Sequence, residues 1–169
     1  MRSIRLRALV PTGDAALVFK QVTAFAQYPS ISADVRRVRV EPGEPQHSHW
    51  EVNFRRGLMR WTEREDIDPE TLSVIFAQTE GDFAEFHGSW QLTPSGDGCA
   101  VLFQVTYDFG IESLAGLMDP LAERVIKRAI CAVLAQVVGT VDVLEGGEAL
   151  TDLGDLAADS GVRIVKGAS

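Results

Sequence analysis

The stretch 119–145, DPLAERVIKRAICAVLAQVVGTVDVLE, predicts one long helix. Asp119 is a good capping residue, and Pro120 suits the first helical position, where the missing N–H of proline is not needed. From Leu121 to Leu144 apolar residues recur every three or four positions, which is the spacing of a helix with a wide apolar face. The few polar residues cannot solvate more than one side, so other elements must cover this helix.

Most of the chain before this helix alternates between apolar and polar residues, as strands with one buried face do. Asp14 or Thr12 can cap a short helix that should interrupt the pattern. This helix should end before Tyr28-Pro29, because a residue preceding proline avoids the α region. Turn residues such as glycine and proline separate the strands, which we expect at 3–10, 34–41, 47–56, 58–67, 71–79, 83–93 and 99–109.

The order strand, helix, six strands, helix predicts an α+β domain. Its short connections favour an antiparallel meander, so a curved sheet of seven strands should wrap around the long helix. We expect this domain to span residues 1–145, with 146–169 as a tail that is either flexible or packed on the domain. The functional question is whether the space between sheet and helix is packed core or a hollow.

The composition and charge argue against several classes of function. The formal net charge of −8 and the pI near 4.8 disfavour a nucleic-acid partner, because phosphate contacts need clustered Lys and Arg. No apolar run is long enough for membrane insertion, so we expect a soluble, cytoplasmic protein, either a monomer or a homodimer. Cys99 and Cys131 are lone cysteines that we expect to be buried, reduced thiols.

Motifs for metal or cofactor chemistry are missing from the sequence. His47 and His49 lie two residues apart on one strand face, but no third ligand occurs at a useful spacing, so we expect no metal site. The chain has no Gly-x-Ser-x-Gly nucleophile motif and no glycine-rich phosphate loop. We therefore expect no cofactor, and acyl-enzyme chemistry is disfavoured.

Large aromatic side chains gather on the predicted inward faces of the strands. Trp50, Trp61, Trp90 and Tyr107 all fall there by strand alternation, and so many rigid rings are hard to pack in a small core. They favour a hollow that binds a ligand, with ordinary core packing as the alternative. In the strand 83–93 the alternation places on the inward side Ala84, Phe86, Gly88, Trp90 and Leu92.

Two charged residues, Arg56 and Glu63, fall on the same inward side of adjacent strands. Unpaired buried charges are costly, so these residues either form an ion pair or face a space filled by water or ligand. Burial should raise the pKa of Glu63, and pairing with Arg56 would partly reverse this rise. A slip of one residue in register would place Arg55 inside instead of Arg56.

Several stretches also carry a resemblance to a known family. They are Val18-Phe19, Tyr28-Pro29, RWTEREDIDPE at 60–70, GDFAEFHGSWQL at 81–92 and YDFG at 107–110. In this order, over residues 3–145, the chain resembles the polyketide cyclase/dehydrase and coenzyme Q-binding branch of the START-like (SRPBCC) superfamily. The resemblance implies the helix-grip fold, in which a curved sheet holds a long carboxy-terminal helix.

The resemblance implies functions of different classes. Cyclases and aromatases of this branch bind a poly-β-ketone tethered to an acyl carrier protein, fold it, and promote aldol closure and dehydration. Quinone-binding members hold a lipid without transforming it, and some members act as regulatory modules at the ribosome, which the acidic charge does not favour. We expect a hydrophobic, polyketide-like substrate and its regiospecific cyclisation, with a lipid or quinone carrier as the alternative.

Ring closure needs a base for an acidic methylene, a donor for the developing enolate or alkoxide, and a shaped site. Glu63 is the candidate acid or base, with a structural salt bridge to Arg56 as the alternative. Arg56 and Tyr107 are the candidate donors. The resemblance implies an inward arginine that positions and polarises the ketones of the substrate, and Arg56 lies close to the place of that arginine. The residues expected to line the substrate site are Tyr28, Trp50, Phe54, Met59, Trp61, Phe86, Trp90, Phe103, Leu117 and Leu121.

Overall fold

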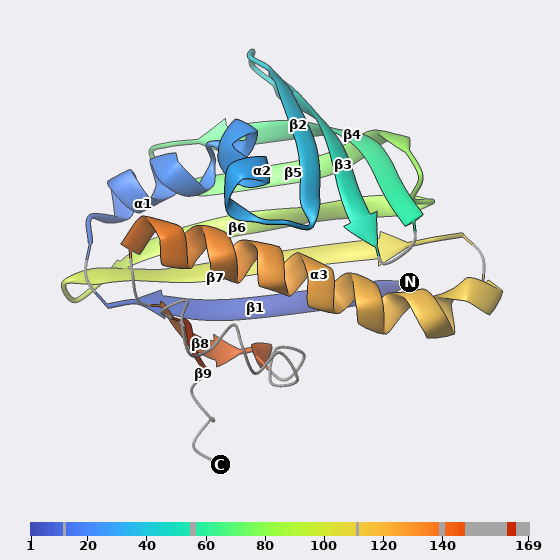
Figure 1. Cartoon of the computed structure of the whole chain (residues 1–169). Helices are drawn as coiled ribbons and strands as arrows, with labels where there is room; N and C mark the ends of the chain where they lie inside the picture. The colour runs from blue at the N-terminus through green and yellow to red at the C-terminus, as the bar shows by residue number, and fades with distance from the viewer. Residues whose placement is uncertain (12, 55–56, 111, 139–140, 148–161, 165–169) are drawn as a thin grey trace.

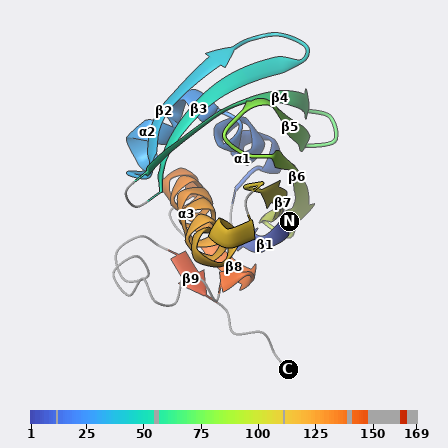
Figure 2. The same ribbon diagram turned by 90° about the vertical axis from the view of Figure 1, so that its right-hand side faces the viewer.

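In the part of the chain that the structure describes, a curved sheet of nine strands wraps around one long helix (Figures 1 and 2). The computed structural model describes residues 1–11, 13–54, 57–110, 112–138, 141–147 and 162–164, and for 112–119, 137–138, 141, 162 and 164 only the backbone. The elements are β1 (Arg2–Val10), α1 (Ala15–Val22), η1 (Phe25–Gln27), α2 (Tyr28–Ile31), β2 (Val35–Glu41), β3 (Gln46–Phe54), β4 (Gly57–Asp68), β5 (Ser73–Gly81), β6 (Glu85–Ser95), β7 (Gly98–Asp108), α3 (Glu112–Val138), β8 (Val141–Glu145) and β9 (Val162–Ile164).

The sheet is a meander that the first strand completes. Its order is β2-β3-β4-β5-β6-β7-β1-β8-β9, and all neighbours are antiparallel except β8 and β9. In the end-on view the sheet curves around α3, with β2 and β3 above the helix and β1 and β8 below it (Figure 2). This arrangement confirms the predicted α+β helix-grip fold. The two short strands β8 and β9 extend it beyond the seven strands that alternation predicts.

The first helix begins where its cap predicts. Asp14 Oδ1 accepts hydrogen bonds from the backbone N–H groups of Ala16 (2.8 Å) and Leu17 (3.4 Å), which otherwise lack partners in the first turn. The first helix ends at Val22, before Tyr28-Pro29 as predicted, but the reason given for this end is wrong, because Tyr28 itself has helical φ and ψ of −57° and −40° and begins α2. Proline is tolerated in a first turn, since its missing N–H has no helical partner there.

The long helix differs from its prediction at both ends. It begins at Glu112 and contains Pro120 internally, and it ends at Val138, so the predicted start at Asp119 and end at Glu145 are wrong. Residues 141–145 form β8, which pairs with β1 through Val143 opposite Ala8. The apolar spacing of this segment fits a helix and a strand equally well. The strand forms because it supplies partners for backbone groups of β1 that an additional helical turn could not reach.

The core lies between the concave face of the sheet and α3. Leu6 of β1, Leu92 of β6 and Leu134 of α3 are all at most 1% exposed. Cys99 and Cys131 are buried free thiols, as expected. None of the described helices is both long and apolar enough to cross a bilayer. Within the segment 146–169, Val162–Ile164 forms β9 beside β8, and the rest of that tail beyond residue 147 lies outside the described residues.

Candidate functional site

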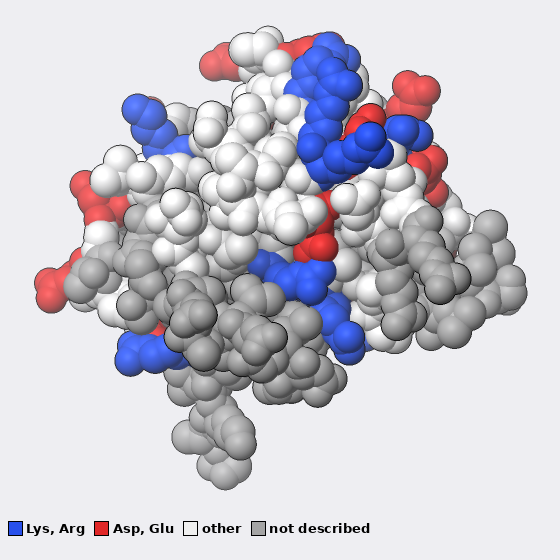
Figure 3. Space-filling view, viewed as in Figure 1, with Lys and Arg blue, Asp and Glu red and all other residues white. Residues whose placement is uncertain are grey.

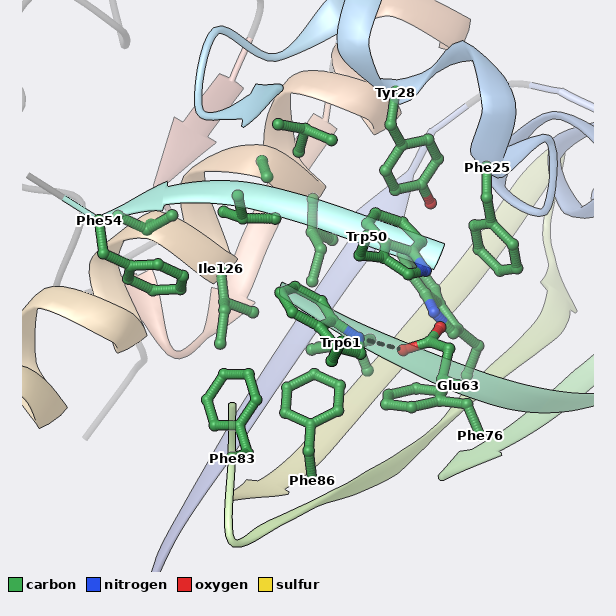
Figure 4. A pocket seen from close by; sticks show the side chains of 17 residues that line it. Phe25, Tyr28, Trp50, Phe54, Trp61, Glu63, Phe76, Phe83, Phe86 and Ile126 are labelled. Atoms are coloured by element: carbon green, nitrogen blue, oxygen red, sulfur yellow. Dashed lines mark hydrogen bonds between the residues drawn. The ribbon is translucent and has the colours of Figure 1, made fainter. Parts of the chain in front are cut away.

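A small apolar cavity lies between α3 and the concave face of the sheet (Figure 4). Its volume is about 80 Å³. The sheet contributes most of its wall, α3 contributes one side, and η1 and α2 contribute an aromatic ring each. The lining residues are Phe25, Tyr28, Val35, Trp50, Val52, Phe54, Trp61, Glu63, Phe76, Phe83, Phe86, Trp90, Phe103, Val125, Ile126, Ala129 and Ile130.

Two stacked tryptophans form the centre of the wall. Trp50 of β3 and Trp61 of β4 are directly opposite each other in register, and their rings lie 5.8 Å apart with an interplanar angle of 3°. The rings of Phe25 (5.7 Å) and Tyr28 (5.4 Å) pack on Trp50, and Phe86 packs on Trp61 at 5.2 Å. Because each ring is held by others, the wall is a rigid, flat surface of the kind that suits a planar or polyene-like ligand.

Phe83 enters this wall from the loop between β5 and β6. The side chain of Gln78 clamps the loop: its Nε2 donates to the Phe83 carbonyl at 2.8 Å, and its Oε1 accepts from the Phe83 N–H at 3.3 Å. Phe83 is 4% exposed, whereas Ala84 is exposed. The predicted inward position of Ala84 is therefore wrong, because β6 begins only at Glu85 and strand alternation does not apply before it.

Two glycines make room for the aromatic wall. Gly81 has φ of +151°, and a Cβ there would lie 2.5 Å from the Cα of Trp61. At Gly88 of β6, a Cβ would lie 2.6 Å from Cζ of the Phe76 ring. A side chain at either position would clash with the backbone of a neighbouring strand and with Trp61 or Phe76, so both glycines allow the strands to pack closely behind the aromatic wall.

Glu63 brings a carboxyl group to the cavity wall. Its side chain points inward from β4, it is 5% exposed, and its Oε2 accepts a hydrogen bond of 2.8 Å from Nε1 of Trp61 (Figure 4). Burial and then the charge of Glu65 raise the pKa of Glu63 well above its usual range, against the opposing effect of the Trp61 hydrogen bond. Among the described residues, no cation pairs with this carboxyl. Glu63 therefore keeps its proton to a higher pH than an exposed glutamate does.

A chain of hydrogen bonds connects Glu65, the next inward residue of β4, to β3. Glu65 is 0% exposed, and it accepts hydrogen bonds from Ser48 Oγ and, at 2.9 Å, from Gln46 Nε2. Ser48 Oγ in turn accepts a hydrogen bond of 2.6 Å from Trp50 Nε1. The two stacked tryptophans thus point their indole N–H groups toward the two carboxyl sites, one directly and one through Ser48.

Tyr28 contributes its ring to the cavity, but its hydroxyl proton is already in use. The hydroxyl donates a hydrogen bond of 2.6 Å to the carbonyl of Val22 at the end of α1. Burial, followed by the charges of Glu63 and Glu65, raises the pKa of Tyr28 far above its usual range. Tyr28 is therefore a neutral phenol whose proton holds α2 against α1, and it packs on a ligand through its ring.

The structure brings most of the predicted site residues together. Eight of them line the cavity: Tyr28, Trp50, Phe54, Trp61, Glu63, Phe86, Trp90 and Phe103. Three do not line it: Met59 and Leu121 are partly buried at the edge of the core, and Tyr107 is fully buried with its ring against Phe83. Arg56 and the side chain of Leu117 lie outside the described residues.

Several lining residues have no counterpart in the sequence-based set. Phe25 and Phe83 lie outside regular strands, so the two-residue period of strands could not assign them. The α3 residues Val125, Ile126, Ala129 and Ile130 follow the helical apolar period, but nothing in that period separates the residues at a cavity from those in packed core. Glu65 is inward by alternation, and only the register opposite Gln46 shows that it has hydrogen-bond partners there.

Two of the three histidines take part in polar side-chain interactions. His49 interacts with Thr62 at 2.8 Å and lies 3.2 Å from Glu41, and His87 lies 2.9 Å from Glu85. In the described part of the chain no three His, Cys, Asp or Glu side chains gather as a metal site would require.

Comparison with known proteins agrees with this geometry. Residues 13–134 match the model of the family described as polyketide cyclase / dehydrase and lipid transport. The chain is 30% identical over 114 residues to the actinorhodin polyketide synthase bifunctional cyclase/dehydratase of Streptomyces coelicolor, covering 63% of this chain and 35% of that protein. The chain thus spans about a third of the length of this curated relative.

Two solved structures share the fold. The Zhui aromatase/cyclase from Streptomyces sp. R1128 is 18% identical with a TM-score of 0.63, covering 90% of this chain and 98% of that one. A START superfamily protein from Mycobacterium smegmatis is 13% identical with a TM-score of 0.68, covering 81% of this chain and 97% of that one. At these identities the likeness shows the fold alone, whereas the family match covers most of the chain. This chain therefore belongs to the polyketide cyclase / dehydrase and lipid transport family.

Proposed function

We propose that this protein binds an elongated, polyketide-like substrate in the cavity and promotes its regiospecific cyclisation by aldol closure and dehydration. The observation that carries the proposal is Glu63, the one carboxyl among the described residues that line an otherwise aromatic and aliphatic cavity. A cavity built only to hold an apolar ligand gains nothing from a buried carboxyl, which is costly to bury even when protonated. Proton transfer to a bound substrate would explain why a carboxyl group is buried at this cavity.

The chemistry needs only protons that the substrate and Glu63 exchange. In the addition step the enol form of one 1,3-diketone unit attacks a ketone carbon, and protonated Glu63 gives its proton to the carbonyl oxygen that becomes the hydroxyl. The enol O–H then returns a proton to Glu63. In the dehydration step Glu63 protonates the departing hydroxyl, which leaves as water, and it recovers a proton from the adjacent carbon. Such general acid–base help typically supplies about 10²–10⁴-fold in rate.

The aromatic wall would select one folded form of the substrate. Trp50 and Trp61 offer a flat face and are each 8% exposed, and the rings of Phe83 and Phe86 pack on Trp61 at 5.4 and 5.2 Å (Figure 4). A ring that forms against this face is favoured over chain conformations that cannot lie flat. The hydrogen bond from the Trp61 indole N–H also holds the Glu63 carboxyl in place while Glu63 donates its proton to the substrate. Arg56 keeps its predicted role as a further donor.

Delivery by an acyl carrier protein is part of the proposal. Lys and Arg side chains gather over β2 on the face shown in Figure 3. Arg36, Arg37 and Arg39 of this strand are all exposed. Val35, at the start of the same strand, lines the cavity. An acidic surface or a phosphate-bearing arm would be attracted to this strand next to the cavity, although the net charge of the whole chain is −8.

A carrier of an apolar ligand is the second candidate function. The lining apart from Glu63 and the Tyr28 hydroxyl is apolar, which suits a lipid or quinone as well as a polyketide. The two functions differ in whether the bound molecule changes.

The test is to incubate the protein with a thioester mimic of a poly-β-ketone and to resolve the products by mass spectrometry. Spontaneous closure is the reference, because such chains cyclise unaided. We expect the wild type to shift the product distribution toward one ring, and Glu63→Gln to remove most of that shift while binding persists, as followed by quenching of tryptophan fluorescence. Asp66→Asn, a change on the exposed face of the same strand, is the matched control and should behave as wild type. An unchanged distribution with bound wild type would leave the carrier function.

A further inference from the structure

A second carboxyl, that of Glu65, lies behind Glu63. Both side chains share the inward face of β4, and Glu65 is 0% exposed. Glu65 is not among the residues that line the cavity, so a ligand there would touch Glu63 only. The charge of Glu65 acts on Glu63 and raises the pKa of the Glu63 carboxyl. Two like charges in a dry site repel each other strongly, which favours a state in which one of the two carboxyl groups carries a proton.

The hydrogen bonds of Glu65 favour its charged form. Ser48 Oγ donates to its Oε1 and Gln46 Nε2 to its Oε2, so both oxygens of the carboxylate have a donor. The direction of the Ser48 bond is determined by Trp50, whose Nε1 donates to the same Oγ and leaves the serine hydrogen free to point at Glu65. Hydrogen bonds to a carboxylate stabilise the ionised state.

The hydrogen bonds of Glu63 leave a place for the proton. Among the described residues, its Oε2 accepts a bond from Trp61 Nε1 at 2.8 Å and no donor bonds to its Oε1, which leaves Oε1 as the site for the proton. The described groups of other elements that face Glu63 are neutral: Tyr28 of α2 is an un-ionised phenol, Gln78 of β5 pairs opposite Glu63, and the lining residues from α3 are aliphatic. The asymmetry within the pair therefore comes from the donors on β3.

We propose that Glu65 is a positioning residue: as the ionised member of the pair it keeps the shared proton on Glu63, and so makes Glu63 a general acid at neutral pH. The role of this proton in ring closure rests on the proposed function, but its location does not. The two carboxyl groups have different roles. Glu63 touches the ligand, whereas Glu65 is held away from the ligand by its hydrogen bonds with Ser48 and Gln46.

The location of the proton can be tested without a substrate. The chain has three tryptophans, so the indole N–H groups of the ¹⁵N-labelled full chain give three signals, of which that of Trp61 reports on Glu63. We expect the Trp61 signal to titrate with a midpoint well above the range near 4.3 that is usual for Glu. In Glu65→Gln the midpoint should fall by more than about one pH unit, because the neighbouring negative charge is gone.

Two further variants make the test decisive. Asp66→Asn, on the exposed face of the same strand, should leave the Trp61 midpoint unchanged. Ser48→Ala removes one donor from Glu65, and should lower the Glu63 midpoint by a smaller amount than Glu65→Gln does. This variant tests the inference if Glu65→Gln does not fold. A midpoint that is the same in wild type and Glu65→Gln, or that lies in the usual range for Glu in the wild type, would overturn the inference.

A kinetic measurement connects the pair to the reaction. With the thioester mimic, ring closure should fall as the pH rises through the Glu63 midpoint, since the protonated form is the active one. In Glu65→Gln this fall should move to lower pH by the same amount as the indole midpoint, with KM little changed. If the indole midpoint moves but the protein causes no ring closure, the proposed function is refuted, and the inference that the proton lies on Glu63 stands. Closure that needs Glu63 but keeps its pH profile in Glu65→Gln would refute the role of Glu65.

Discussion

At the scale of the residue, burial of the Glu63 carboxyl lowers the stability of the folded protein and favours the protonated form of this group at the cavity. It is 5% exposed and has one indole N–H as its neutral donor, and the neighbouring Glu65 acts on it as a like charge. Its pKa is therefore higher in the folded protein than in the unfolded chain. Between these two pKa values the folded state binds more protons than the unfolded state, so stability falls as the pH rises.

We predict that Glu63→Gln changes the pH dependence of stability. In the wild type the contribution of Glu63 is fully present below its unfolded pKa near 4.3, and it is lost as the pH rises through the folded value, at up to about 1.4 kcal/mol per pH unit. Glutamine keeps the shape and can still accept the Trp61 bond, but it does not titrate. Urea melts between pH 4 and 8 should show a flatter profile for the variant and a growing advantage toward neutral pH. Parallel profiles would mean that Glu63 titrates alike in both states.

At the scale of the element, ion pairs attach α3 to both sides of the sheet. Glu123 accepts hydrogen bonds from Lys127, at 2.7 Å, and from Arg2 of β1. On the other side Arg128 makes two bonds of 2.7 and 2.6 Å to the carboxylate of Asp34, just before β2. Because β1 and β2 lie far apart in the strand order, the two attachments hold α3 across the concave face and so define one wall of the cavity.

We predict unequal costs for the two partners of the buried pair in α3. The Lys127 side chain is 4% exposed, so Glu123→Ala leaves a buried cation without its carboxylate and should cost about 3 kcal/mol. Lys127→Met should cost less, because methionine fills similar space and Glu123 retains Arg2. Arg64→Ala breaks an exposed pair with Asp66 and should cost less than about 1 kcal/mol, as a control. Denaturant melts at pH 7 measure all three, and equal costs for the first two would contradict the buried-pair account.

At the scale of the whole molecule, the cavity is smaller than the ligands proposed for it. Its volume of about 80 Å³ compares with roughly 150 Å³ for a cavity that holds benzene. A polyketide can therefore enter only if elements of the wall move apart. The bidentate Asp34–Arg128 pair joins α3 to the start of β2, so separation of these two elements would have to break it. Ligand binding in this protein should thus be coupled to movement of α3 relative to β2.

We predict that enlarging the cavity from α3 improves the binding of a small aromatic probe. Ile126→Ala should cost about 2 kcal/mol in stability, since Ile126 is only partly buried, and should add volume beside Trp61 (Figure 4). Benzene at saturating concentration should then raise the melting temperature of the variant more than that of the wild type. Ile75→Ala is the matched control, because Ile75 is 63% exposed on the outer face of β5 and should change neither property. Equal stabilisation of Ile126→Ala and wild type by benzene would show that this wall does not bound the cavity.

Much of the fold and half of the site followed from local rules. The two-residue period of strands placed Trp50, Trp61, Glu63 and Phe86 on the inward face, because alternate side chains of any strand must point to opposite sides. Asp14 predicted the start of α1 for a similarly local reason, since a cap bonds within its own turn. The family resemblance then implied which sheet those strands form.

Tertiary contacts decided the rest. The valines of 141–145 form a strand because β1 offers an open edge, and Phe83 lies inside because Gln78 holds its loop. The state of Glu63 depends on residues that are distant in the chain, since Ser48 and Gln46 reach Glu65 only through the pairing of β3 with β4. The volume of the cavity depends on how closely α3 packs on the sheet. The apolar period of a sequence predicts to which side of a strand or helix a side chain points, but it does not give the distance from that side chain to its neighbours in the fold. Hydrogen bonds, pKa values and cavities all depend on these distances.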